Sequence, residues 1–431
     1  MVRIETVVGL MSGTSMDGID AAVIKTDGHM YIEEIGYISV AYHPYIQQLL
    51  KAAEALVRQY QGTLEQVIKV DFEVTLNQYL QKTLNLSEVD VIIHIHAIKK
   101  YLGIKKVSFE TVIQLSTNLH SETVVEVLKK CHLKPHQIYT IGYHGQTLYH
   151  NPKQKITMQI GDGQQLASST GIEVVSDFRA KDVQAGGQGA PFAPLYHQAL
   201  AVRDGKIPLA VLNCGGISNI TVIKDANPES LVGFDPGPGN GLIDQFVRLR
   251  TQGKDAMDMD GKYGCHGKVD PIVLEALRQK AVWENGQNYL SKIPPKSLDV
   301  GDLHLVPELD QLSLEDGCAT LEAFTADAIV QSLDFMQPPY PKHWILAGGG
   351  WYNPAIKQEL MRRLKDRIGQ DADIKTADEA GWNSRALEAQ IFAYLAVRHL
   401  KGLPTSYPGT TGVSVPIVGG QSFKPMISKC S

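Results

Sequence analysis

The stretch GLMSGTSMDGID, residues 9–20, decides the fold of this chain. An apolar run containing Ile4, Val7 and Val8 leads into it, and a second apolar run, AAVI at 21–24, follows it. Small residues and hydroxyls fill the space between the two runs. This pattern predicts a strand, a tight turn and a second strand.

The predicted turn carries groups suited to binding an anion. Glycines let the backbone come close to a ligand, and successive N–H groups of a turn form a concave surface for negative charge. Ser12, Thr14 and Ser15 add hydroxyl donors for phosphate oxygens. Asp17 and Asp20 can hold Mg²⁺ or the water molecules around it. Taken alone, the turn is equally compatible with an ordinary glycine- and serine-rich hairpin.

Composition and charge narrow the class of protein. The 431 residues are 43% hydrophobic and 20% charged, which is typical of a globular enzyme with two or three domains. The net charge of −5 argues against nucleic acid as a partner. Neither a membrane span nor a signal peptide is expected. The five cysteines are scattered and lack CxxC spacing, so we expect neither disulfides nor zinc, and a cytoplasmic location.

The strand–glycine–strand pattern returns after Pro208. LAVLNCGGISNITVI, residues 209–223, predicts a second hairpin, and HWILAGGGWYNP, residues 343–354, predicts a strand, a triple-glycine turn and a helix. Two hairpins with following helices predict an α/β fold of two similar lobes. We expect lobe I at 1–205, completed by a C-terminal helix at 384–400, and lobe II at 206–383.

Three glycine-rich turns that each follow a strand can together hold a nucleotide. No Walker motif is present, and GPGNG at 237–241 lacks the Rossmann spacing. In this interpretation both hairpins contact the phosphates and the third turn lies beside the adenosine. The residues of the second and third turns expected to bind the nucleotide are Gly215, Gly216, Gly348, Gly349 and Gly350.

The spacing of apolar residues predicts helices in 46–84 and at 121–131. SEVDVIIHIHA, residues 87–97, predicts a buried strand. His94 and His96 would then share one face, as in a metal-binding HxH motif. Without a third ligand nearby, ordinary strand histidines are the favoured interpretation.

Eight strings recur in the order found in one known family. They are MSGTSMDGIDAA (11–22), GYHGQTLYH (142–150), QIGDGQQLA (159–167), VVSDFRAKDVQAGGQGAPFAP (174–194), LNCGGISNIT (212–221), GFDPGPGNGLID (233–244), LAGGGWYNP (346–354) and PGTTGV (408–413). Together they resemble the anhydro-N-acetylmuramic acid kinases, a family of the actin–hexokinase–heat-shock-chaperone ATPase superfamily. The resemblance covers nearly the whole chain.

The resemblance implies a two-lobed, actin-like ATPase of ribonuclease-H-like fold with the nucleotide in the cleft between the lobes. It implies an enzyme that uses ATP, with Mg²⁺, to hydrolyse the 1,6-ether of anhydro-N-acetylmuramic acid and to phosphorylate the freed O6. The product would be N-acetylmuramic acid 6-phosphate, as in the recycling of cell-wall peptidoglycan. A homodimer is also implied.

The family's functional residues fall on two segments. Its ATP-binding segment falls on Gly13, Thr14, Ser15, Met16, Asp17, Gly18, Ile19 and Asp20, and its catalytic aspartate, in the string SDFR, falls on Asp177. The residue pattern agrees, because a strand ending at Asp177 delivers its carboxylate to the edge of a sheet where ligands bind. There the carboxylate can take a proton from water. The competing interpretation pairs Asp177 with Arg179; Asp182 ranks second as a base because its neighbours suggest a solvated turn.

Three further residues are candidates for binding the sugar. His144 and Gln146 lie where a predicted strand runs into a loop, and both can hydrogen-bond sugar hydroxyls or the acetamido group. A buried histidine with internal partners is the equally weighted alternative for His144. Gln188 lies in a glycine-rich loop that allows close approach of a sugar or is simply a loop. Glu322 can point into the cleft between the lobes, although Leu321, Phe324 and Ile329 indicate that its helix serves mainly for packing. No residue is assigned to the metal.

Several segments depart from the family pattern. Residues 71–119 are longer than usual and form either an insertion in lobe I or an altered dimer surface, and 257–267 and 294–303 match loosely. The loose matches favour, as the alternative, a kinase of the same fold acting on another amino sugar or sugar. A non-catalytic ATP switch is a further alternative, but such a switch needs no base at Asp177.

Overall fold

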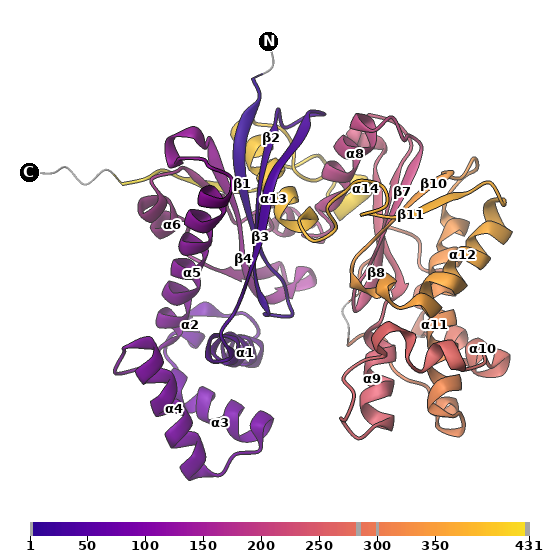
Figure 1. Ribbon diagram of the computed structural model, residues 1–431, viewed down its shortest axis with the longest axis horizontal. Helices are drawn as coiled ribbons and strands as arrows, with labels where there is room; N and C mark the ends of the chain where they lie inside the picture. The colour runs from indigo at the N-terminus through magenta and orange to yellow at the C-terminus, as the bar shows by residue number, and fades with distance from the viewer. Residues whose placement is uncertain (1–2, 282–285, 299–300, 427–431) are drawn as a thin grey trace, which may run out of the picture. The chain divides into compact units, whose positions relative to one another are not determined.

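The computed structural model describes residues 3–281, 286–298 and 301–426. The chain divides into two compact units (Figure 1). The first comprises Met1–Phe192, Ala386–Pro408 and Gly412–Ser431, and the second comprises Ala193–Arg385 and Gly409–Thr411. Helix α8 (Ala193–Arg203) thus belongs to the second unit, whereas the sequence placed the join near residues 203–208.

A mixed sheet forms the centre of the first unit. Its strand order is β12-β6-β4-β1-β2-β3, and β5 is added beside β4. β1 and β2 pair antiparallel, as the sequence predicts, whereas β4 runs parallel to both β1 and β6. The strands are β1 (Glu5–Ser12), β2 (Gly18–Thr26), β3 (Ile32–Ala41), β4 (Thr140–Asn151), β5 (Ile156–Ile160), β6 (Val174–Ser176) and β12 (Gln421–Phe423).

Helices cover both faces of this sheet. Val8 and Leu10 pack with residues of α5 (Phe109–Lys130) and α6 (Gly163–Thr170) on one face. Helix α13 (Leu387–Leu400) lies on the other face, where glycines admit it. A Cβ on Gly9 would lie 1.8 Å from the Ala389 carbonyl oxygen, and one on Gly142 would lie 1.9 Å from that of Phe392. No other residue type permits this close contact between α13 and the sheet.

A group of helices with its own apolar core follows β3. It contains α1 (Pro44–Gln59), α2 (Leu64–Val67), α3 (Phe72–Leu84) and α4 (Glu88–Leu102), which confirms the helices predicted within 46–84. The strand predicted at 87–97 is wrong, because this segment lies in α4. The Ser87 Oγ accepts a hydrogen bond from the Asp90 N–H at 3.2 Å, and Gly103 ends the helix in a left-handed conformation.

The buried residues of α4 explain why it is a helix. Val91, Ile95 and Ile98 are buried at spacings of four and three residues, so one helical face enters the core. His94 and His96 consequently do not share a face. His94 contacts the Gln48 side chain at 2.8 Å, whereas His96 is exposed.

The second unit repeats the plan of the first. Its strand order is β11-β10-β7-β8-β9, with β7–β8 and β8–β9 antiparallel and β7–β10 and β10–β11 parallel. This order matches β6-β4-β1-β2-β3 strand for strand, so the predicted duplicated ribonuclease-H-like fold is confirmed. The strands are β7 (Leu209–Cys214), β8 (Ile217–Ile223), β9 (Val232–Pro238), β10 (His343–Ala347) and β11 (Asp373–Thr376).

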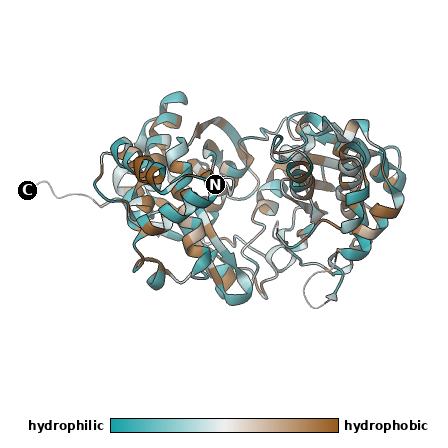
Figure 2. Ribbon diagram, turned by 90° about the horizontal axis from the view of Figure 1, so that it is seen from below, coloured by the Kyte–Doolittle hydropathy of each residue, from teal (hydrophilic) through white to brown (hydrophobic). Residues whose placement is uncertain are grey.

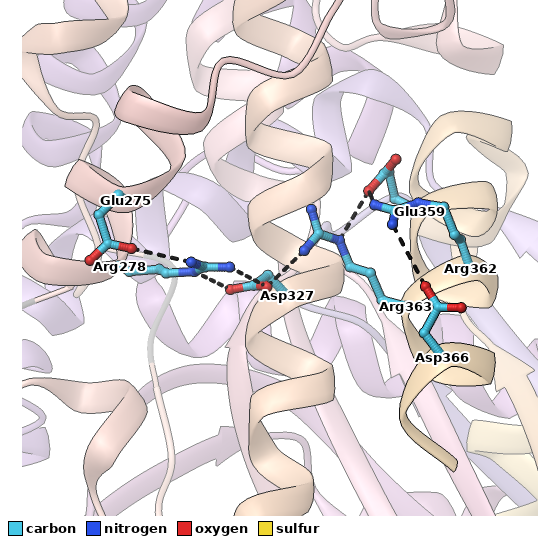
Figure 3. Close-up of polar contacts among 7 residues, drawn as sticks. All are labelled: Glu275, Arg278, Asp327, Glu359, Arg362, Arg363 and Asp366. Atoms are coloured by element: carbon cyan, nitrogen blue, oxygen red, sulfur yellow. Dashed lines mark hydrogen bonds and ion pairs between the residues drawn. The ribbon is translucent and has the colours of Figure 1, made fainter. Parts of the chain in front are cut away.

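Three helices of the second unit are tied together by charges. α10 (Pro271–Lys280), α11 (Leu314–Gln331) and α12 (Pro354–Ile368) meet at Asp327 (Figure 3). Arg278 donates to both carboxylate oxygens of Asp327 at 2.5 and 2.7 Å. Arg363 donates to Asp327 at 2.9 Å and to Glu359 at 3.0 Å. Three more α-helices complete the described residues. α7 (Ala180–Gln184) belongs to the first unit and α9 (Gly241–Arg250) to the second, and α14 (Pro408–Thr411) is divided between them.

Helices such as α1 and α10 bury one apolar face, whereas α8, α11 and α13 are buried on nearly all sides. Brown and teal stretches alternate along the helices in both units (Figure 2). Across the part of the chain that the structure describes, no helix has the length and apolarity to cross a membrane. In that same part, Cys131, Cys214, Cys265 and Cys318 are free thiols.

Candidate active site

The turn between β1 and β2 is anchored by a buried side chain on one side and is exposed to solvent on the other. Met16, in a left-handed conformation, is fully buried in the helical core, and its N–H donates to the Gly13 carbonyl at 3.1 Å. Thr14, Ser15 and Asp17 are exposed. A Cβ on Gly13 would meet only the Ser15 Oγ, at 3.5 Å, so the space above Gly13 is free for a ligand.

The other residues of segment 13–20 differ in burial and in the groups they contact. Gly18 begins β2, and a Cβ there would lie 2.5 Å from the Val40 carbonyl oxygen of β3. Ile19 is buried in the sheet. The Asp20 carboxylate accepts a hydrogen bond from the Tyr37 hydroxyl at 2.5 Å. Gly18 and Ile19 thus shape the hairpin, whereas Asp17 and Asp20 present carboxylates.

Gln146 links this turn to the neighbouring strand. It belongs to β4, which continues through the segment where the sequence predicted a loop. Its fully buried side chain donates to the Gly13 carbonyl at 3.0 Å and accepts from the Ser12 hydroxyl at 2.6 Å. Gln146 therefore uses both ends of its amide to hold the glycine turn.

Asp177 follows β6 and lines a pocket. The carboxyl ends of the parallel strands β1, β4 and β6 lie at one edge of the sheet, so Asp177 and the first turn share that edge. The pocket measures ≈360 Å³, and His144, Gln159 and Ser176 line it with Asp177. Asp177 is exposed on the pocket side and has φ of 56°. Desolvation by its neighbours raises the pKa of this carboxyl above its ordinary value.

His144 holds Arg179 beside this pocket. The His144 Nδ1 contacts the Gly145 carbonyl at 2.8 Å, and its Nε2 lies 3.1 and 3.0 Å from the Arg179 Nε and Nη2. A guanidinium only donates, so Nε2 accepts and the proton lies on Nδ1. Burial and the charge of Arg179 keep the pKa of His144 well below its ordinary value. His144 is therefore a buried, neutral histidine with both nitrogens engaged.

Arg179 is fixed on its other side by the loop that contains Gln188. Its Nη1 donates to the Gly189 carbonyl at 2.5 Å, and burial lowers the pKa of Arg179 to about 10. The Gln188 carbonyl accepts from the His150 Nε2 at 2.9 Å. Within the described residues Arg179 forms no ion pair with Asp177, so the competing interpretation of Asp177 as its partner is wrong. In the sequence, Arg179 stands out only as a partner for Asp177.

Asp182 is not the solvated residue that its neighbours in sequence suggested. It is fully buried, and its carboxylate accepts a hydrogen bond from the Gly189 N–H at 2.6 Å. A Cβ on Gly187 would lie 2.2 Å from the same carboxylate. Asp182 thus anchors the glycine-rich loop.

Charged groups at this edge of the sheet shift the pKa of the Glu388 carboxyl, which lies on α13. Desolvation and the charge of Asp20 raise the pKa of Glu388, whereas the positive charge of Arg179 opposes the rise. Acidic and basic groups from β2, α13 and the segment after β6 are therefore near one another in the first unit.

The second unit brings its two glycine turns together. Cys214, at the end of β7, is fully buried, and a Cβ on Gly350 would lie 2.4 Å from its sulfur. Gly348 has φ of 90°, and a Cβ there would lie 2.6 Å from the Cys214 carbonyl oxygen. A Cβ on Gly349 meets nothing within 4 Å. The loop after β9 donates to the carbonyls of Gly215 and Gly216 at 2.8 to 3.0 Å.

Two acidic positions in the second unit were not among the predicted site residues. Asp244, in the first turn of α9, has its pKa raised to about 6 by partial burial. Asp258, in the loosely matching segment 257–267, is almost fully buried and accepts from the N–H groups of Tyr263 and Gly264 at 2.7 and 3.0 Å. Asp244 could have been noticed, because its carboxylate closely follows the glycine string GPGNG. Nothing in the sequence indicated the burial of Asp258.

Glu322 is fully buried inside the second unit, which agrees with the packing role that the sequence favoured for its helix. Its Oε1 accepts from the Asn353 Nδ2 at 2.6 Å. Burial, together with the carboxyl of Asp258, raises the pKa of Glu322 to about 9. A Cβ on Gly264 would lie 1.8 Å from the Glu322 Oε2, so this glycine makes room for the carboxyl.

Known proteins resemble this chain over nearly its whole length. The family model for anhydro-N-acetylmuramic acid kinase matches residues 5–99 and 96–425. The anhydro-N-acetylmuramic acid kinase of Methylobacterium nodulans is 38% identical over 428 residues, covering 97% of this chain and 99% of that protein. The protein of the same name from Methylorubrum populi is 40% identical over 420 residues, covering 97% and 98%. The chain belongs to the anhydro-N-acetylmuramic acid kinase family.

Proposed function

We propose that this chain hydrolyses the 1,6-anhydro bond of anhydro-N-acetylmuramic acid and transfers the γ-phosphate of ATP to the freed O6. The products are N-acetylmuramic acid 6-phosphate and ADP. The observation that carries the proposal is the placement of Asp177, at the carboxyl end of β6 and in a pocket on the same sheet edge as the first glycine turn. The names of the relatives supply the substrate.

Asp177 acts as the general base in this proposal. An anhydro sugar has no free hydroxyl at O6, so a simple phosphate transfer has no nucleophile. Asp177 takes a proton from water while the water oxygen bonds to C1 and the C1–O6 bond breaks. The electron pair released to O6 attacks the γ-phosphorus, and ADP leaves. The raised pKa of Asp177 makes it a stronger base than an ordinary aspartate.

Arg179 and Gln146 support this chemistry without taking the proton. Because His144 is neutral and accepts from Arg179, the guanidinium keeps its charge and one orientation next to His144, which lines the pocket with Asp177. Gln146 binds the carbonyl of Gly13 and so holds the shape of the turn, in which the exposed Thr14 and Ser15 can offer N–H groups to phosphate oxygens. We therefore assign His144 and Gln146 to positioning within the site.

The nucleotide contacts follow from the glycine turns. In the first unit, the exposed residues of segment 13–20 receive the phosphates, and in the second unit Gly215, Gly216 and the 348–350 turn are the expected nucleotide contacts. Asp17 is exposed and Asp20 is partly exposed, which suits a hydrated Mg²⁺ bound through one or two carboxylates. The ion would offset the negative charge of the phosphates. We place the activity in the cytoplasm, where ATP is available, and expect a homodimer.

One assay tests the proposal directly. ADP release is measured with a panel of anhydro and ordinary amino sugars, and products formed in ¹⁸O-water are analysed by mass spectrometry. We expect turnover with anhydro-N-acetylmuramic acid and label at the C1 hydroxyl, with none in the phosphate. Label in the phosphate group, or preference for a sugar with a free O6, would contradict the proposal.

A substitution tests the role of Asp177. Asp177→Asn should keep ATP binding and lose turnover by about 100-fold or more, because the amide cannot accept the proton. Asp366→Asn, at an exposed position of α12, serves as the matched control. Near-normal turnover of the Asp177 variant would assign the base to another residue.

A further inference from the structure

The side chain of Gln159, on β5, is bonded at one end of its amide and has no partner at the other. Its Nε2 donates to the hydroxyl oxygen of Thr157 at 2.9 Å and to that of Thr147 at 3.4 Å. Its Oε1 is shielded from solvent and has no hydrogen-bond partner among the described residues. A buried acceptor without a donor is unfavourable, so this oxygen indicates a ligand that supplies the donor.

A series of hydrogen bonds fixes the direction of the Gln159 amide. The Gln188 carbonyl only accepts, so the His150 Nε2, 2.9 Å away, carries a proton. Burial and the charge of Arg179 lower the pKa of His150 to about 4, so its Nδ1 is unprotonated and accepts from the Thr157 hydroxyl at 3.0 Å. The Thr157 oxygen must then accept from Gln159. Turning the amide over would place two acceptor oxygens against each other, so Oε1 stays on the side away from Thr157.

Gln159 lines the pocket that Asp177 also lines. Among the described residues around this pocket there is neither a lysine nor an arginine, and Asp177 is acidic, so the pocket favours an uncharged part of a ligand over a carboxylate. The apolar side chains of Met158, Ile160 and Phe423 contribute to the same lining. The pocket therefore suits a neutral group that combines a hydrogen-bond donor with a methyl group.

We propose that Gln159 is a specificity-determining residue whose Oε1 accepts a hydrogen bond from the acetamido N–H of the sugar. The inference rests on the proposed function, because the acetamido group belongs to the substrate named there. An amide N–H only donates, which matches an acceptor that lacks a donor, and the acetyl methyl group meets the apolar part of the lining. Thr157 and His150 are positioning residues, because they hold the Gln159 amide in this direction.

Two sugars that differ only in this N–H test the contact. Calorimetry measures the dissociation constants of anhydro-N-acetylmuramic acid and of its analogue with an acetyl ester in place of the acetamide. The wild type should bind the acetamide at least about 10-fold more tightly, because the ester leaves Oε1 without a donor. Gln159→Leu should bring this ratio to about one. Gln154→Leu, at an exposed position between β4 and β5, is the matched control and should keep the wild-type ratio.

Variants of Thr157 test the same contact without altering Gln159. Thr157→Val removes the acceptor that orients the amide and should lower the ratio, whereas Thr157→Ser keeps the hydroxyl and should preserve it. A purely structural role would weaken the binding of both sugars equally and leave the ratio unchanged. Absence of turnover of the acetamide sugar by the wild type would overturn the proposed function. Turnover of that sugar, together with an unchanged ratio in Gln159→Leu, would overturn the role of Gln159 alone.

Discussion

Gln146 is the residue through which β4 controls the shape of the phosphate turn. Gln146→Ala leaves the Gly13 carbonyl and the Ser12 hydroxyl without this partner. We expect an increase of the KM for ATP and a loss of about 1–3 kcal/mol in the free energy of unfolding. Steady-state kinetics and chemical denaturation measure the two effects. Gln279→Ala, on the exposed side of α10, is the control, and an unchanged KM in the Gln146 variant would show that the turn keeps its shape unaided.

Glu322 makes stability depend on pH. Its pKa is about 9 in the folded protein and near the ordinary 4.5 in the unfolded chain, so the unfolded state releases the proton first as pH rises. The stability present below pH 4.5 is therefore lost progressively between pH 4.5 and 9. Glu322→Gln keeps an acceptor for Asn353 and cannot ionise. Its melting temperature should exceed that of the wild type by a margin that grows from pH 5 to pH 8.

At the next scale, Asp327 joins three helices through two arginines. Asp327→Ala removes the shared acceptor of Arg278 and Arg363 and should lower the free energy of unfolding by about 1–3 kcal/mol. Asp334→Ala removes an exposed partner of Arg367 and should cost less than about 1 kcal/mol. Urea denaturation compares the two variants. Equal losses would mean that the network of Figure 3 acts as separate surface pairs.

Elements with a strong local pattern could be predicted from the sequence. Both hairpins follow from apolar runs separated by glycine-rich turns, and the helices within 46–84 follow from their spacing. The strand prediction for segment 87–97 was wrong because it followed the intrinsic preference of valine and isoleucine for strands. Its buried spacing at Val91, Ile95 and Ile98, together with the caps at Ser87 and Gly103, makes it helical. Local residue preference and helical packing disagree there, and packing prevails.

The positions of site residues could be predicted better than their contacts. Asp177 follows its strand as expected, because a strand end is a local feature. Asp182 and His144 could not be predicted in the same way, since their partners, the Gly189 N–H and the Arg179 guanidinium, are 7 and 35 residues away. The proton position on His144 depends on that distant arginine. Contacts of this kind arise only when the chain has folded.

For the whole molecule, the repeated strand order predicts that both units take part in binding the nucleotide. Hydrogen exchange with a non-hydrolysable ATP analogue should slow at residues 13–20 and also at 214–216 and 348–350. Exchange in α4, which carries none of the proposed nucleotide contacts, is the internal control. Protection limited to residues 13–20 would show that the second unit contributes nothing to the nucleotide site.

The order of the two units along the chain has a consequence for synthesis. The second unit is nearly continuous, from Ala193 to Arg385, whereas the first needs α13 against β1 and β4, and β12 against β6. Because the chain grows from its N-terminal side on the ribosome, β1 and β4 are made before α13 and cannot complete their packing until α13 has been made. We therefore expect the second unit to reach its native state first, while the face of the first unit's sheet that packs on α13 stays uncovered until α13 has been made.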